Sequence, residues 1–521
     1  MKVARTVPSG GKSVKIYLSQ LLRSNASVTL FSNISSINAP AKEDNKAILA
    51  SVHSNKNRKD EDKGYVRLNG RLILVTKSEL LNLIEQSKQR SKEDYLKKRF
   101  NSDFLSSLQS LLNGVFTAEG SISGQFTSRT SHRFNPKFSI GQNASSESIE
   151  LFSLMWVVLD FKLVWEISKN NNMNYHIQLR STNLEYMINT LFPYFSLTYG
   201  EKYTAMFKLL RIVELEKVNT VLSKMEIICL VYSLTSGGQN RVIPLEDKIV
   251  SCIDVGTLTL SSTVESLKKE ISYNFAENNL PLNICFILGF FLGDGSLYIR
   301  IRDKVSGLVF IPKFEIKQKN TPSSLHLVNM ITRFFLEKGV QASIQSDKNY
   351  VISFVEGIDN VCHKLLPLLE EHKELFFWKA RQLTMTNMFG KLISLDTRNL
   401  LTVKYLLIKT IYSIENNRNY PIGHWIKRID EIFKNKSAKN VSGEFYITSV
   451  KDKHDKTIQN GWSVYLPEFL NATPRNKYFY FEKSGGKDKA LLAAVAWRDL
   501  IIDNWLKDNG YEIDPIIEKD S

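Results

Sequence analysis

Two acidic residues stand at the same place in two copies of one sequence pattern. Residues 112–120 read LNGVFTAEG and residues 287–295 read ILGFFLGDG, so Glu119 and Asp294 each precede a glycine that is followed by serine. Two carboxylates held close together repel unless divalent cations lie between them, and hard oxygen ligands suit Mg²⁺. Such ions could activate water and stabilise the leaving oxygen of a phosphodiester. Both acids are therefore candidate catalytic residues and metal ligands.

Both acid-bearing segments read as apolar helices with a glycine near the middle. Gly114 and Gly289 take corresponding places in the two segments. A glycine removes the side chain where two helices would otherwise collide, so these helices can pack with their backbones in close approach. Their acidic ends would then lie side by side. A single acid before a turn glycine is usually only a solvated residue, but two at matching places in a long repeat favour a shared site.

The segments that follow the two helices also correspond, element by element. The first helix precedes a strand pair closing in FSIGQ at 138–142, a helix near 147–161 and a strand pair around 164–179. The second precedes a strand closing in FEIKQ at 314–318, a helix near 324–337 and strands around 342–354. Strand alternation and helical periodicity assign αββαββα to each copy. The sequence predicts an α+β protein with two pseudo-symmetric half-domains.

Four further polar residues recur beside the repeated elements. Gln142 and Gln318 each end a strand whose alternation is otherwise apolar, and Lys202 and Lys379 each follow a closing helix. A polar side chain at an apolar position normally forms a hydrogen bond with a partner. These four are candidate catalytic residues that orient water and stabilise developing charge. Local hydrogen bonding or an exposed lysine is the ordinary alternative for each of them.

Strands next to the acids alternate apolar residues with residues that can bind DNA. Such a sheet, with helices on its apolar face, can enter the major groove and contact base edges and phosphates. Two such sheets would form a long DNA-binding saddle, whereas an ordinary solvent-facing surface is the rival interpretation for any one residue. The candidate DNA-binding residues are Ser123, Gln125, Thr127, Arg129, Tyr298, Arg300, Arg302, Lys313 and Lys317.

The composition favours a polyanionic partner. The 521 residues carry a formal net charge of +16, and 43% of them are hydrophobic, as in ordinary globular proteins. Charge alone leaves a nucleic acid, an anionic membrane surface and a merely basic protein open. No apolar run reaches the roughly 18 residues of a membrane helix, so we expect no membrane span. The four cysteines show neither disulfide nor zinc-ligand spacing.

Residues 1–100 read as a basic N-terminal extension. Basic residues and serines fill 1–42, and the first acid is Glu43, a composition seen in mitochondrial transit peptides. We therefore expect a mitochondrial protein, with a plastid as the alternative, although a basic arm without a targeting role would read the same way. Asn69-Gly70 between two apolar alternating runs predicts a hairpin, followed by a charged helix from about Ser78.

The pattern changes again beyond about residue 440. Strands at 445–450, 462–466 and 477–481 precede an alanine-rich helix from 488 to about 506, which together predict a βββα module. Glycine, asparagine and serine gather at 236–240, where the connection between the repeats begins. The expected domains are the N-terminal extension at 1–100, the first half-domain and linker at 101–265, the second half-domain at 266–438, and the C-terminal module at 440–521.

The paired helices resemble the motifs of LAGLIDADG homing endonucleases and the related intron maturases, over about residues 101–435. The resemblance implies double-strand DNA cleavage that leaves short 3′ overhangs, with Mg²⁺ held by Glu119 and Asp294. It also implies that Gln142, Gln318, Lys202 and Lys379 fall where the family has water-ordering and basic active-site residues. The sequence departs from the family pattern two positions before each acid, where Thr117 and Leu292 stand instead of aspartate.

The C-terminal module is similar to AP2-like DNA-binding domains, on the strength of Trp462, the aromatic run at 478–481 and the alanine-rich helix. A structural appendage is the alternative. Taken together, the resemblances imply a metal-dependent endodeoxyribonuclease that binds a duplex DNA target as a monomer and promotes intron homing. The alternatives are a maturase that binds its own intron RNA without cutting DNA, and a DNA-binding protein without enzymatic activity.

Overall fold

The computed structural model describes most of the chain from residue 62 onward. The described residues are 62–68, 71–128, 130–234, 243–254, 260–273, 280–304, 307–394, 407, 408, 411, 421–436, 447–452, 455, 456, 458–466 and 474–508. Arg129 and the Asn69-Gly70 turn lie outside them.

The first repeat forms one four-stranded antiparallel sheet with helices on its apolar face. In the sheet the strands are ordered β3-β4-β6-β5. Its elements are α4 (Ser102–Glu119), β3 (Gly120–Phe126), β4 (Phe134–Asn143), α5 (Ser146–Val158), β5 (Val164–Lys169), β6 (Tyr175–Ser181), α6 (Leu184–Tyr186), the π-helical η2 (Met187–Leu191) and α7 (Phe192–Tyr194).

The second repeat has the same order of elements and the same sheet topology. Its strands are ordered β7-β8-β10-β9, all antiparallel. Its elements are α12 (Ile284–Asp294), β7 (Gly295–Lys304), β8 (Gly307–Lys319), α13 (Pro322–Glu337), β9 (Ala342–Ser346), β10 (Tyr350–Glu356), the π-helical η4 (Asp359–Leu365) and α14 (Leu366–Glu370). The predicted fold class, α+β with two αββαββα units, is confirmed.

Local sequence signals repeat along with the elements. α4 begins after Asn101, whose side chain accepts a hydrogen bond from the Phe104 amide at 2.7 Å, and α12 begins after Asn283, which caps its helix in the same way. The core contacts repeat too. Phe116 stacks on Phe138 with ring centroids 4.7 Å apart, and the corresponding pair in the second repeat has centroids 4.8 Å apart.

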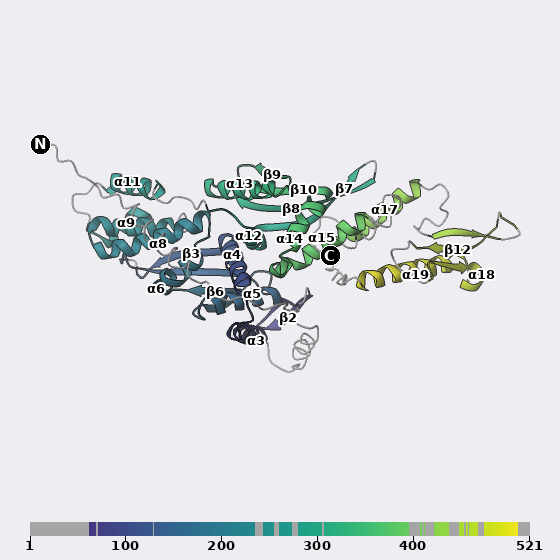
Figure 1. The fold of residues 1–521 in the computed structure, drawn as a ribbon, viewed down its shortest axis with the longest axis horizontal. Helices are drawn as coiled ribbons and strands as arrows, with labels where there is room; N and C mark the ends of the chain where they lie inside the picture. Colours follow the sequence, from purple (N-terminus) through teal and green to yellow (C-terminus); the bar gives the residue numbers. More distant parts are fainter. Residues whose placement is uncertain are drawn as a thin grey trace.

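The helices α4 and α12 lie against each other between the two sheets (Figure 1). Their backbones approach so closely that a β-carbon built on Gly114 would lie 2.0 Å from the Phe286 carbonyl oxygen, and one built on Gly289 would lie 1.9 Å from the Leu111 carbonyl oxygen. No side chain fits at either position. The two glycines therefore fix the spacing of the helices whose ends carry the acids.

Asn113, on α4, was not singled out from the sequence, but it ties this helix to the closing segment of its repeat. The side chain is fully buried, donates to the carbonyl oxygens of Gln109 and Tyr194 at 2.8 and 3.0 Å, and accepts from the Leu197 amide at 2.9 Å. The second repeat has the apolar Leu288 six residues before its acid, where the first has Asn113.

Asn113→Leu should therefore destabilise the first repeat, although leucine has a similar size. The substitution leaves the Leu197 amide without its partner inside the core, while the Tyr194 carbonyl keeps only its hydrogen bond from Gln109, which together costs about 1–3 kcal/mol. Thermal unfolding would show a lower Tm than the wild type. Asn82→Leu, on the exposed face of the N-terminal helix described next, is the control and should leave the Tm nearly unchanged. Equal Tm values for the two variants would contradict this assignment.

The N-terminal hairpin and helix pack on the first repeat. They comprise β1 (Lys63–Leu68), β2 (Arg71–Thr76) and α3 (Lys77–Leu96), which confirms the predicted strand pair and charged helix. The Tyr65 and Arg67 amides donate to the carbonyl oxygens of Met173 and Ala144 at 2.9 and 3.1 Å. α3 packs along α5.

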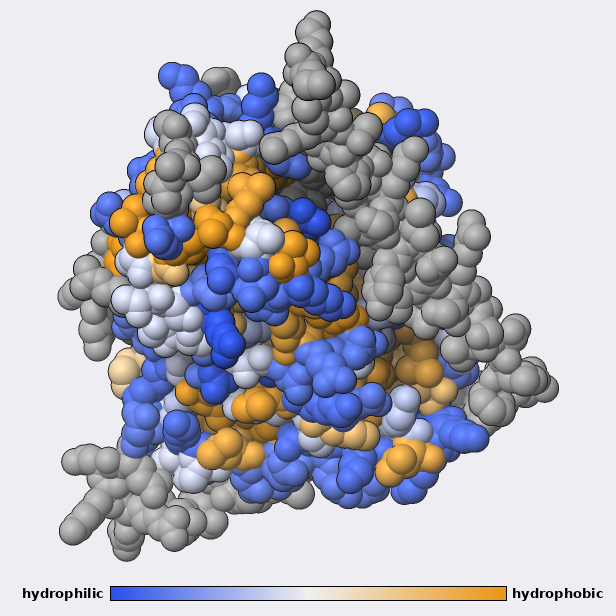
Figure 2. Space-filling model, turned by 90° about the vertical axis from the view of Figure 1, so that its left-hand side faces the viewer, coloured by the Kyte–Doolittle hydropathy of each residue, from blue (hydrophilic) through white to orange (hydrophobic). Residues whose placement is uncertain are grey.

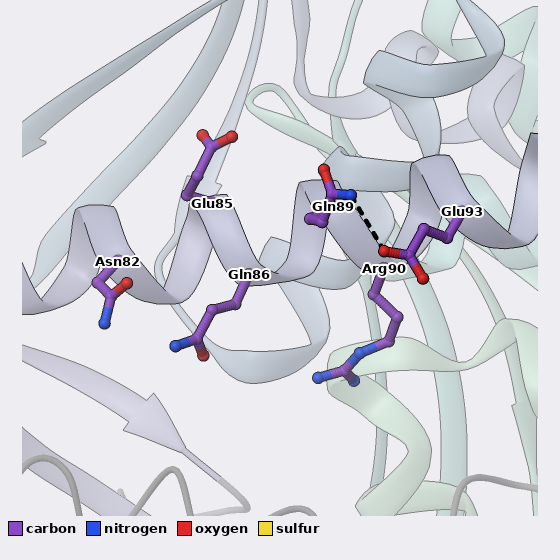
Figure 3. Close-up of a pocket in the computed structure, with 6 residues that line it drawn as sticks. All are labelled: Asn82, Glu85, Gln86, Gln89, Arg90 and Glu93. Carbon is purple, nitrogen blue, oxygen red and sulfur yellow. Dashed lines mark hydrogen bonds between the residues drawn. The ribbon is translucent and has the colours of Figure 1, made fainter.

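A shallow hollow of about 410 Å³ runs along the outer side of α3 (Figure 3). The side chains that line it are polar and come from this one helix, and a hydrogen bond of 3.0 Å from Gln89 to Glu93 closes one end. The hollow is lined by Asn82, Glu85, Gln86, Gln89, Arg90 and Glu93. It is built from residues far in sequence from the two acids, and we assign it no chemistry.

Four helices connect the repeats: α8 (Gly200–Val218), α9 (Val221–Ser233), α10 (Leu245–Cys252) and α11 (Leu260–Tyr273). Of these, α8, α9 and α11 lie toward the left end of the view in Figure 1, a side on which hydrophilic residues are interspersed with hydrophobic groups (Figure 2). The buried Lys248 of α10 donates to the Ser128 carbonyl at 3.0 Å and lies over the Phe126 ring, so the connection holds the end of β3.

The remaining helices follow the second repeat and lead to the C-terminal module. They are the 3-10 helices η5 (Lys373–Leu375) and η6 (Phe377–Lys379), then α15 (Ala380–Ser394) and α17 (Ile422–Lys436). The module contains β11 (Ile447–Lys451), β12 (Gln459–Tyr465), β13 (Asn476–Tyr480), α18 (Phe481–Ser484) and α19 (Lys487–Asp508). The predicted three-stranded sheet followed by a helix is confirmed. Among the described helices, none has the length and apolar character to cross a membrane.

Candidate active site

The two predicted acids meet where α4 and α12 end. A β-carbon built on Gly293, the residue before Asp294, would lie 2.9 Å from Cγ and 3.3 Å from Oε1 of Glu119. The C-terminal residues of the two helices are thus in direct contact, with one carboxylate on each. Strand β3 starts directly after Glu119 and β7 directly after Asp294. Both acids therefore lie where a helix pair meets two sheets.

Burial makes both acids hard to ionise. Desolvation raises the pKa of Glu119, and repulsion from the Asp294 carboxylate raises it further. Desolvation also raises the pKa of Asp294. In each case Lys379 and Lys202 act in the opposite direction through their positive charge. Two half-buried acids that share a site and resist ionisation are stabilised in their charged form by an added cation.

Each acid has its predicted glutamine beside it. Gln318 donates to Oδ2 of Asp294 at 2.5 Å, and this hydrogen bond lowers the Asp294 pKa. A hydrogen bond from Gln142 lowers the pKa of Glu119. Both glutamines share a sheet face with apolar core residues, because Phe138, Ile140 and Gln142 alternate along β4. The strands β4 and β8 therefore each place one glutamine amide beside the acid at a helix end.

Lys379 lies behind the acid of the second repeat. It is 8% exposed, and its ammonium donates to the carbonyl oxygens of Phe291 and Gly295 at 2.5 Å each, at the end of α12. Desolvation lowers the Lys379 pKa to about 7, while the charges of Asp294 and Glu119 hold it up. The ammonium donates to carbonyl groups at a helix end, where a positive charge is favourable, and adds positive charge near both acids.

The two lysines do not occupy equivalent positions, contrary to the predicted match. Phe195 packs on Phe116 as Phe376 packs on Phe291, which fixes the correspondence of the closing segments. Lys379 follows Phe376 by three residues, whereas Thr198 stands three residues after Phe195. Lys202 reaches the site instead from the first turn of α8. Desolvation lowers its pKa, and Glu201, Asp294 and Glu119 raise it.

The Lys379 amine should titrate near neutral pH and should depend on the acids. With selectively ¹³C-labelled lysine, NMR should show one amine with a pKa of about 7 in the metal-free protein. Glu119→Gln and Asp294→Asn should each lower this pKa, because each removes a negative charge that favours the ammonium. Glu337→Gln, an exposed change on α13, should leave it unchanged. A Lys379 pKa that rises in the two acid variants would contradict the assigned geometry.

The site fits a cation that shares its ligands with a substrate. Within the described part of the chain, no cluster of three or more His, Cys, Asp or Glu side chains could hold a metal ion. Glu119 and Asp294 therefore supply two carboxylates and no all-protein cage. Mg²⁺ is commonly held by one or two carboxylates together with water and substrate phosphates. The repulsion between these half-buried acids is the feature that a divalent cation would relieve.

The polar face of the first sheet carries the predicted residues of β3. Ser123 is half-buried, whereas Gln125 and Thr127 are exposed. Ser123 lies opposite Lys137 on β4. Sequence reasoning missed three charged residues on this face, because only the strand order brings them together. They are Lys137 on β4, Glu166 on β5 and Arg180 on β6; Glu166 lies 3.8 Å from Lys137 and 3.5 Å from Arg180.

The second sheet carries Tyr298, Arg300, Arg302, Lys313 and Lys317 on its polar face, as its burial alternation indicates. Arg302 and Lys317 are exposed. Lys313 is not: it is 9% exposed and lies 2.7 Å from Glu315. Arg300 is ion-paired with Glu356 at 2.8 Å. Lys313 and Arg300, both predicted to bind DNA, are therefore held in ion pairs on this face.

No protein-family model matches the sequence, and no curated protein matches it. The structure is similar to solved structures of LAGLIDADG homing endonucleases over about 60% of the chain. A point mutant of I-SmaMI matches with 16% identity and a TM-score of 0.46, covering 60% of this chain and 98% of that one. I-LtrWI bound to target DNA matches with 17% identity and a TM-score of 0.44, covering 60% and 99%.

Proposed function

We propose that this protein is a site-specific endonuclease that hydrolyses both strands of duplex DNA with a divalent metal, in particular Mg²⁺. The observation that carries this proposal is the meeting of Glu119 and Asp294 at the tips of two abutting helices. Each tip leads directly into a sheet whose outer face is polar and carries cations. One chain thereby supports two half-sites, so we propose that it acts as a monomer.

The residues of the site divide the chemical work. Glu119 and Asp294 would hold the cation, and the amides of Gln142 and Gln318 fix each carboxylate and can order a water molecule. Lys202 and Lys379 add positive charge where negative charge develops on a phosphate. When bound, Mg²⁺ supplies Lewis-acid activation of water and neutralises charge on the leaving oxygen.

The two sheets are the proposed DNA contact. Side chains on β3, β4, β7 and β8 can contact base edges and phosphates in the major groove, which a two-stranded ribbon can enter. The net charge of +16 adds long-range attraction to the phosphate backbone. In the organism we propose an organellar homing function, mitochondrial or alternatively plastid, in which cleavage of an allele that lacks the host element promotes its insertion.

Strand cleavage on a defined duplex tests this function. The probe is the uninterrupted sequence formed by joining the two flanks of the element that encodes the chain. We expect double-strand breaks that require Mg²⁺ and stop when EDTA is added. Tight binding of the element's own transcript, with no scission of the duplex, would instead support the RNA maturase and overturn the nuclease proposal. Duplex binding without Mg²⁺-dependent scission would support a non-enzymatic DNA-binding protein and would also overturn the nuclease proposal.

A further inference from the structure

Three carboxylates lie on the sheet faces proposed to bind DNA. Glu315 lies on β8, Glu356 on β10 and Glu166 on β5. The pairing register places Glu356 opposite Lys313 and Glu315 opposite Ser296, on the same face as Arg300. Glu166 lies opposite Gln178, on the same face as Arg180. None of these positions points into the apolar core.

Each of these carboxylates is held by a cation from the same face. Lys313 lies 2.7 Å from Oε2 of Glu315, and the Tyr298 hydroxyl donates to that oxygen at 3.1 Å. Arg300 reaches across β8 to bind Glu356 at 2.8 Å. Lys313 also lies over the Phe354 ring at 4.7 Å, so its position is fixed on two sides.

This arrangement is unfavourable for binding phosphates. A carboxylate repels a polyanion, and a lysine or arginine that is already ion-paired contributes less to the release of counterions from DNA. A face selected for affinity alone would carry the cations without the acids. The side chains are also partly removed from solvent, Lys313 being 11% and Glu315 19% exposed. The pairing of these side chains therefore indicates a role other than contact with the DNA phosphates.

Read as hydrogen-bonding groups, the couples match the order of groups on a G·C edge, where two adjacent acceptors precede the amino donor; on an A·T edge the amino donor lies between two acceptors. In the major groove, cytosine presents an amino donor and guanine presents two acceptors. A carboxylate beside a lysine or arginine presents an acceptor next to donors. Arg300 binds Glu356 through one terminal nitrogen, Nη2, and its side chain is 36% exposed, so other guanidinium donors are left for a base edge.

We propose that Glu315 and Glu356, each with its paired cation, are specificity-determining residues that read G·C base pairs, and that Glu166 does the same in the first sheet. The carboxylate accepts from the cytosine amino group while the cation donates to guanine. The same carboxylate disfavours other base pairs and unrelated DNA, because without the cytosine amino group its loss of water is not compensated and its charge repels the phosphates. This proposal rests on the proposed function, because it requires that the sheets enter the groove of a duplex.

The test compares Glu315→Gln, Glu356→Gln and Glu166→Gln with the wild type. The probe is a set of duplexes in which each base pair of the cleaved sequence is replaced singly, and binding is measured without Mg²⁺. We expect each variant to lose about five- to one-hundred-fold of discrimination at one or two G·C positions and to bind unrelated duplex more tightly. Glu337→Gln, on the exposed side of α13, should change neither quantity.

The outcomes separate the two proposals. A wild-type protein that cleaves its duplex, with glutamine variants that keep the full wild-type preference at every position, would overturn the inference and leave the proposed function standing. A wild-type protein that neither binds nor cleaves duplex would overturn both. Unchanged Tm values in the variants would show that lost discrimination is not lost folding, and restoration of the preference by Glu356→Asp would support the carboxylate's role.

Discussion

Glu119→Gln and Asp294→Asn should each reduce strand cleavage by about 10³-fold or more, because each removes a charged ligand and no third His, Cys, Asp or Glu of the described residues joins this pair to form a metal cluster. The substitutions keep the size of each side chain, and the acids lie at helix ends outside the proposed DNA-contacting strands. Duplex binding in the absence of metal should therefore stay within a few-fold of the wild type. Cleavage and binding would be measured on the same duplex, with Glu337→Gln as the control.

The same variants should be more stable than the wild type when no metal is present. Burial raises the pKa of both acids above the ordinary values of 4.5 and 3.8, so the folded protein holds their protons more tightly than the unfolded chain does. Stability of the wild type therefore falls as pH rises from these ordinary values through the raised ones. The amide variants do not titrate, so their advantage in Tm should be present at neutral pH and vanish below about pH 3.5.

Two results would contradict this account of the acids. Cleavage that persists in either variant within ten-fold of the wild type would remove that acid from the chemistry. A Tm at neutral pH that is lower in both variants than in the metal-free wild type would mean that the charged carboxylates stabilise the apo protein, against the direction of their pKa shifts. Addition of Mg²⁺ should raise the Tm of the wild type more than that of either variant.

Gly114→Val and Gly289→Val should each separate the central helices and disrupt the fold of the repeat pair. Even the first atom of a side chain would lie 2.0 Å or less from a backbone oxygen of the other helix. Backbone cannot rotate away as a side chain can, so the helices must move apart and the packed apolar residues around them lose contact. We expect a loss of about 3 kcal/mol or more in the free energy of unfolding, with loss of cleavage.

Gly423→Ala provides the matched control for the helix glycines. Gly423 lies in α17 with open space around the position of a β-carbon. Alanine favours helix over glycine, so this change should leave the Tm equal to the wild type or slightly higher. Thermal unfolding and cleavage would be compared across the three variants. A Gly114→Val protein with wild-type Tm and activity would show that the two helices do not touch at this point.

Much of the fold could be predicted because its signals are local. A pattern of a few residues is enough to predict the repeated helix, the strand ending in glutamine and the apolar helix that follows it. The alternation of residue types along β3 and β7 also predicted which face of each strand is polar. The C-terminal strands and helix were predicted on the same basis. The AP2-like interpretation of that module stays a prediction. The residues from 440 to 521 contain 11 lysines and arginines against 13 acids, so the chain's excess positive charge lies before them.

What could not be predicted depends on contacts between distant segments. Lys202 and Lys379 were paired because each follows a closing helix, but a different length of chain leads to each, and only packing shows that they reach the site from unlike positions. The alternation along its own strand predicted that Lys313 contacts DNA. Its ion pair with Glu315 joins two residues of β8 that share a face, and its contact with Phe354 requires the neighbouring strand β10. The buried bonds of Asn113 join residues about eighty positions apart.

Locating a bound cation would test directly whether Glu119 and Asp294 share a metal ion at the helix ends. Crystals of the protein grown with duplex and soaked in Mn²⁺ would be measured for anomalous scattering. The account predicts a peak between the two helix ends, with a carboxylate oxygen of Glu119 and one of Asp294 each within about 2.2 Å of a bound ion. Well-ordered acids that face away from each other, or Mn²⁺ bound only elsewhere, would contradict it.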